Sequence, residues 1–163
     1  MEDERLRGIV EENTFLKNST VSHTFGDGFD ADFCTGKVVG ANFYKTGNDG
    51  IDFSTSAIAI INTEIKQAGD KGISIGEEGR SVIVNTLIDG AVIGIASKDF
   101  STVTVKSANL KNCVNGFSAY QKKPEYGGGR IIVEKYNAEN LTALYKIFPG
   151  STLKLLDKEI VGN

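Results

Sequence analysis

The chain has 163 residues and a formal net charge of −3, so it lacks the basic surface expected of a nucleic-acid-binding domain. This length indicates one domain with room for a real core. Nineteen glycines against two prolines favour many short strands and turns over long helices. The acidic start, Met1 to Glu4, resembles no secretion signal, and no apolar run is long enough to cross a membrane, so neither is expected.

A repeat of 22 residues organises the chain. It is marked by five glycines, each followed by a bulky apolar residue: Gly28-Phe29, Gly50-Ile51, Gly72-Ile73, Gly94-Ile95 and Gly116-Phe117. After each glycine the first and third residues are mostly apolar and the second is polar or small, which predicts a strand with one face inward. We therefore expect Ile51, Ile73 and Ile95 in one interior column. The glycines themselves are expected at corners that need a positive φ.

A second landmark has the same period. An aliphatic residue is followed five positions later by another apolar residue in Leu16–Val21, Val38–Phe43, Ile60–Ile65, Val82–Leu87 and Val105–Leu110, with a one-residue slip at the last pair. Two or three short strands per 22 residues form one rung of a parallel β-solenoid, whose rungs stack at ~4.8 Å. The fold class is thus all-β, a single-domain solenoid of about seven coils.

The domain plan follows from this period. Residues 1–12 are expected to form an N-terminal cap, 13–120 the regular coils, 121–130 an inserted loop about five residues longer than the period, and 131–163 the C-terminal coils and cap. In the last part, Ala143-Leu144 is expected to replace the glycine–apolar pair, and Leu155–Ile160 to form a final pair. Cys34 and Cys113 lie more than three coils apart, so no disulfide is expected. Exposed rung edges also make a homo-oligomer one expectation.

The repeat resembles the right-handed parallel β-helix of pectate-lyase-like proteins. Three stretches, residues 26–30, 47–54 and 69–76, are similar to β-helix segments of bacterial proteins that carry a spore-coat-type kinase-like module. The resemblance implies a right-handed solenoid in a carbohydrate-related setting, at the bacterial envelope or outside the cell. It also implies that the sequence is a piece of a longer protein.

Aspartates recur at equivalent positions of adjacent rungs. Asp30 and Asp52 share one outward position, and Asp27 and Asp49 share another, so like charges lie about one rung apart. The favoured interpretation is turn chemistry, because Asp beside Gly is typical of Asx-turns. A Ca²⁺ site of Asp27, Asp30, Asp49 and Asp52 is the next interpretation, the alternative being no cofactor at all.

Catalysis ranks below both interpretations. Asp30 and Asp52 would be the carboxylate pair of a glycoside hydrolase, and Lys71 is the best-placed base for a lyase. The resemblance implies a Gly-His-Gly and an Arg-Ile-Lys segment for the pectin hydrolases of this fold. The sequence has neither: its one histidine, His23, lies between Ser22 and Thr24. We therefore lean towards a protein that is not an enzyme.

The face that follows the glycines is the predicted ligand-binding surface. Lys98 and Tyr120 lie four residues after their glycines, and the insertion adds three further candidates, Lys122, Lys123 and Tyr126. Tyrosine rings suit sugar stacking and lysines suit acidic groups. The sequence therefore predicts a non-catalytic carbohydrate- or envelope-associated module whose partner is a polysaccharide. A degenerate lyase or hydrolase using Asp30 and Asp52 stays open, as does a scaffold without ligand.

Overall fold

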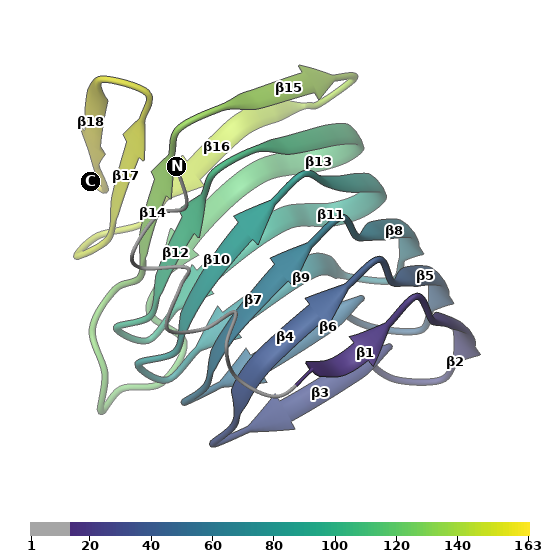
Figure 1. Ribbon diagram of the computed structural model, residues 1–163. Coiled ribbons are helices and arrows are strands. Elements are labelled where there is room, and N and C mark those ends of the chain that lie inside the picture. The colour runs from purple at the N-terminus through teal and green to yellow at the C-terminus, as the bar shows by residue number, and fades with distance from the viewer. Residues whose placement is uncertain (1–13) are drawn as a thin grey trace, which may run out of the picture.

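The structure is a computed structural model that describes residues 14–163, and these residues form an all-β solenoid of about six turns (Figure 1). Each turn contributes strands to three faces, named A, B and C. Face A is a parallel stack of β1 (Thr14–Lys17), β4 (Thr35–Val39), β7 (Ala57–Ile61), β10 (Arg80–Val84), β12 (Thr102–Val105), β14 (Arg130–Val133) and β17 (Thr152–Leu155). Among the described residues no helix could cross a membrane.

Faces B and C meet in two long strands, β11 (Thr86–Lys98) and β13 (Ala108–Tyr120). The first halves of these strands join β2 (Thr20–Thr24), β5 (Asn42–Thr46), β8 (Glu64–Ala68) and β15 (Tyr136–Glu139) in face B. Their second halves join β3 (Phe29–Asp32), β6 (Ile51–Ser54), β9 (Lys71–Gly76) and β16 (Ala143–Ile147) in face C. Face C therefore carries every strand that follows a repeat glycine.

The core consists of ladders of like residues, as predicted. Ile51 pairs with Ile73 and Ile73 pairs with Ile95, and all three side chains are fully buried. Phe29 and Phe117 extend the same interior column at its two ends. Each rung exposes its apolar face unless the next rung covers it, so the column ties the turns into one cooperative body.

The repeat glycines are required by close stacking and not by a positive φ, which corrects the prediction. Among the described residues, the glycines with positive φ are Gly40, Gly90 and Gly150, none of which belongs to the repeat. A Cβ at Gly72 would lie 2.7 Å from the carbonyl oxygen of Gly94 and 2.6 Å from Ile88 Cγ2. The other four repeat glycines have an equivalent backbone oxygen at 2.6–2.7 Å.

Many tight corners are instead turned by asparagine. Asn62, Asn85, Asn112 and Asn140 all have φ between 45° and 54°. Asparagine tolerates this left-handed conformation better than most residues do. The amide of Asn85 donates to the side-chain oxygen of Asn62 at 2.8 Å, and the amide of Asn140 donates to that of Asn112 at 2.6 Å. These contacts tie neighbouring corners together along the solenoid.

The one-residue slip lies earlier than predicted. Ile60 pairs with Ile83, an offset of 23 residues, so the extra residue precedes Arg80 in the turn after β9. The buried pair of this coil is therefore Ile83 and Ile88, in place of the predicted Val82 and Leu87. The chain recovers the beat because β11 runs straight from face B into face C without the corner that separates β8 from β9.

The C-terminal end also differs from the predicted coils. Asn115 pairs with Ala143 and Phe117 with Tyr145, so Leu144 takes the glycine position and Tyr145 the apolar one. The predicted pair Leu155–Ile160 is a hairpin, in which β18 (Lys158–Val161) runs antiparallel to β17. This hairpin replaces a further turn and explains why the structure has about six turns and not seven.

Two smaller predictions can also be placed. Both cysteines are free: Cys113 is buried, and Cys34 is partly exposed. The predicted N-terminal cap, residues 1–12, lies outside the described residues.

Candidate ligand-binding face

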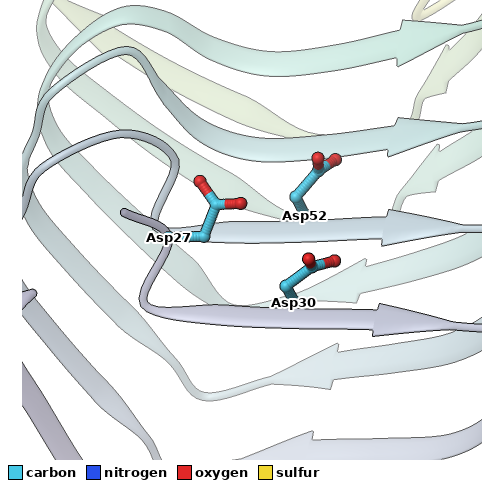
Figure 2. Close-up of side chains that lie close together, drawn as sticks. All are labelled: Asp27, Asp30 and Asp52. Carbon is cyan, nitrogen blue, oxygen red and sulfur yellow. The ribbon is translucent and has the colours of Figure 1, made fainter. Parts of the chain in front are cut away.

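Three aspartates converge at the N-terminal end of face C. Asp30 and Asp52 are paired neighbours on β3 and β6, and Asp27 precedes β3. One carboxylate oxygen from each lies within 4.8 Å of those of the other two (Figure 2). Burial raises the pKa of Asp30, and the negative charges of Asp32, Asp52 and Asp27 raise it further. The cluster is therefore a concentration of like charge.

Asp27 performs the turn chemistry that was the favoured interpretation. Its Oδ1 accepts hydrogen bonds from Asn48 Nδ2 at 2.7 Å and from the Asp49 backbone N–H at 2.9 Å. The carboxylate thus ties the corner before β3 to the same corner of the next turn. Its second oxygen has no such role in the turn.

Asp49 does not join the other three aspartates. Its Oδ1 accepts the Lys71 backbone N–H at 3.0 Å and lies 3.4 Å from Lys71 Nζ, and the residue is only 1% exposed. Burial raises the pKa of Asp49, and Lys71 partly offsets this. Lys71 also pairs with Asp70, and its pKa is raised above the usual range. Because Lys71 stays protonated, it is poorly suited to act as a base.

Lys98 is a buried counter-ion and not a surface contact. Its side chain passes over Gly76, where an added Cβ would lie 3.1 Å from Lys98 Cε. Its Nζ ends 3.5 Å from Asp52 Oδ1, two turns away along face C, and the residue is 4% exposed. This predicted ligand-binding lysine therefore neutralises part of the aspartate cluster.

A cavity of about 430 Å³ lies at the C-terminal end of the same face. Its lining combines apolar and polar side chains from three consecutive turns: Val92, Ile93, Asn115, Ser118, Tyr120, Gln121, Lys146, Phe148 and Pro149. The rings of Tyr120 and Phe148 meet edge to face at 5.9 Å, and Lys146 Nζ lies 4.9 Å from the Phe148 ring centre. Burial raises the pKa of Tyr120 to about 12, so its hydroxyl keeps its proton.

The predicted insertion forms an ordered loop beside this cavity. Thr102 pairs with Arg130 at an offset of 28 residues, whereas Arg80 pairs with Thr102 at the usual 22. Buried Asp99 anchors the loop, because its Oδ1 accepts the backbone N–H groups of Lys122 and Lys123 at 2.6 and 2.9 Å. Gln121 Nε2 donates to three carbonyl oxygens of the loop.

Two of the predicted ligand-binding residues in this loop have partners within the protein. Lys123 pairs with Glu77, and Tyr126 packs edge to face on Phe100 with ring centres 6.3 Å apart. Lys122 is exposed. Of the five predicted ligand-binding residues, Tyr120 alone lines the cavity. His23 is exposed and packs on Tyr44 on face B, away from both the cluster and the cavity.

The comparison with known families agrees with this architecture. A family model described as "Right handed beta helix region" matches residues 8–142, which is most of the chain. The chain belongs to this right-handed β-helix family. No curated protein and no solved structure matched it. As a right-handed β-helix, the protein presents face C as one continuous parallel sheet, with the aspartate cluster and the cavity at opposite ends.

Proposed function

We propose that the protein is a non-catalytic module that binds polysaccharide on face C. The observation that supports this most is the cavity between Tyr120 and Phe148, which combines apolar walls with a few polar groups in the manner of ligand sites. Exposed aromatic rings suit the apolar faces of sugars, and the side chains of Asn115 and Gln121 can exchange hydrogen bonds with hydroxyl groups.

The shape of the solenoid favours a polymer over a small ligand. Face C extends over all six turns, and its outward positions next to the cavity carry the small side chains of Ser74, Ala96 and Ser118. A chain seated in the cavity can therefore continue along the sheet without meeting a bulky side chain in this column. The resemblance to envelope-associated β-helices supports the same setting for the ligand.

The test is affinity electrophoresis of the full chain in gels that contain neutral or acidic polysaccharides. We expect retardation by at least one polymer. Phe148→Ala should weaken it about tenfold, because stacking contacts of this kind contribute about 1–2 kcal/mol. Phe33→Ala is the matched control, because Phe33 is 80% exposed and does not line the cavity. Absence of binding to every polymer would refute the proposal and leave a scaffold without ligand.

A second candidate function rests on the aspartates. Asp30, with its raised pKa, would be the general acid of a glycoside hydrolase, and Asp52 the second carboxylate. Their separation of at most 4.8 Å is close to that of retaining enzymes, about 5 Å. Release of reducing ends from a polysaccharide, abolished by Asp52→Asn, would support this function. Unchanged release in that variant would exclude it.

A further inference from the structure

We propose that Asp27, Asp30 and Asp52, together with the hydroxyl of Ser74, form a binding site for one calcium ion. The site is separate from the cavity and does not depend on polysaccharide binding. A hydrolytic pair needs two carboxylates, so that function would leave the third carboxylate and the serine without a purpose. A cation site uses all four groups.

The distances suit calcium. Calcium–oxygen bonds are about 2.3–2.6 Å long, so two oxygens on opposite sides of one ion lie up to about 5 Å apart. The three carboxylate oxygens lie within 4.8 Å of one another, which allows all of them to contact a single ion. The turn uses Asp27 Oδ1, and Oδ2 is available to a cation.

The charge balance also calls for a cation. Three carboxylates gather here with Asp32 nearby, and the ammonium group that approaches them, Lys98 Nζ, lies 3.5 Å from Asp52. One lysine cannot balance three carboxylates. A divalent ion would neutralise the remaining two charges and remove the repulsion.

Ser74 provides an independent indication of a ligand. It pairs with Asp52 on the neighbouring strand and occupies the outward column of Asp30 and Asp52, because its neighbours Ile73 and Ile75 both point into the core. The residue is fully buried, yet its Oγ has no hydrogen-bond partner. Figure 2 shows the Asp52 carboxylate turned along the column, away from Asp30. A buried hydroxyl without a partner is costly, and ligation would satisfy it.

The donor types select the ion. All four groups offer oxygen, with no imidazole or thiolate among them, which favours calcium or magnesium over zinc. Two donors extend from adjacent strands, one lies in a corner and one is a hydroxyl. Such an irregular set fits the flexible coordination of calcium better than the strict octahedron of magnesium.

The test is isothermal titration of chelator-treated full-length chain with CaCl₂, and in parallel with MgCl₂. We expect one calcium ion per chain and weaker or no magnesium binding. Asp52→Asn should lower the affinity about tenfold or more, and Ser74→Ala severalfold. Lys98→Met should raise the affinity, because it removes the competing ammonium group. Asp32→Asn is the control: it removes a nearby charge from outside the cluster.

Two results would overturn the proposal. One is the absence of calcium binding by the wild-type chain up to about 10 mM, beyond the range of weak extracellular sites. The other is binding that Asp52→Asn and Ser74→Ala leave unchanged. Circular dichroism of each variant establishes that it is folded, so a lost site is distinguished from a lost fold. Polysaccharide binding that persists in Asp52→Asn keeps this outcome separate from that of the cavity.

Discussion

The ion pair of Asp49 and Lys71 shows how single residues hold adjacent turns together. Asp49 is 1% exposed and receives both the backbone N–H and the ammonium group of Lys71 from the next turn. Loss of one partner from a buried pair leaves the other charge without compensation. The recurrence of Asp27 and Asp49 in the sequence therefore marks a structural link between corners. Each of the two carboxylates accepts a backbone N–H from the following turn.

We predict that Asp49→Asn lowers the free energy of unfolding by about 2–4 kcal/mol, measured by urea denaturation. Asp70→Asn is the matched control, because Asp70 contacts the same ammonium group with a side chain that is 40% exposed. That variant should lose less than about 1 kcal/mol. Equal losses in the two variants would show that burial of Asp49 does not matter.

Asp30 gives a prediction with a defined pH dependence. Its pKa is raised in the folded protein, so the folded state holds this proton up to a higher pH than the unfolded state does. The charged carboxylate therefore costs stability that is absent below the unfolded value of 3.8 and is fully present above the folded pKa. In chelator, Asp30→Asn should raise Tm at pH 7 by about 1–3 °C and change nothing near pH 3. A lower Tm at pH 7 would contradict this cost.

At the scale of the element, the rung is defined by how closely two strands approach at each repeat glycine. The sequence locates these glycines and the strands after them, because the 22-residue beat is regular there. It does not explain them, since close packing and positive φ both select glycine. The printed pattern cannot separate the two causes, whereas the 2.7 Å approach of Gly94 O to an added Cβ at Gly72 does.

We predict that Gly72→Ala destabilises the fold by about 2–3 kcal/mol, because the new methyl group would meet backbone that cannot yield. Gly26→Ala should change stability by less than about 0.5 kcal/mol, because no atom lies within 4 Å of an added Cβ there. Thermal unfolding of both variants provides the comparison. Similar melting temperatures would mean that the stacked glycines can be replaced.

For the candidate site, prediction from sequence succeeds within the regular coils and fails beyond the insertion. The stacking of Asp30 on Asp52 follows directly from the period. The partnership of Tyr120 with Phe148 does not, because the offset there is 28 residues and the insertion hides it. Lys98 is also misjudged, since a pattern of positions does not show that a side chain crosses Gly76 to reach Asp52.

At the scale of the whole molecule, face C is a single sheet with opposite character at its two ends. The first turns present the aspartates, and the last turns present the cavity with Lys146 and Phe148. The solenoid makes this arrangement stable because each rung is held by its neighbours through interior columns such as Ile51–Ile73–Ile95. The ends can therefore hold different ligands without any change in the core.

The most direct test of the polysaccharide proposal is NMR mapping of the labelled full chain with the polymer that retards it in gels, or with each polymer of the panel. The account predicts amide shift changes at residues 115–121 and 146–149, continuing along β11 and β9 on face C. Residues of face A, including β7 and β10, should stay unchanged. Shift changes confined to face A, or none with any polymer, would contradict the account.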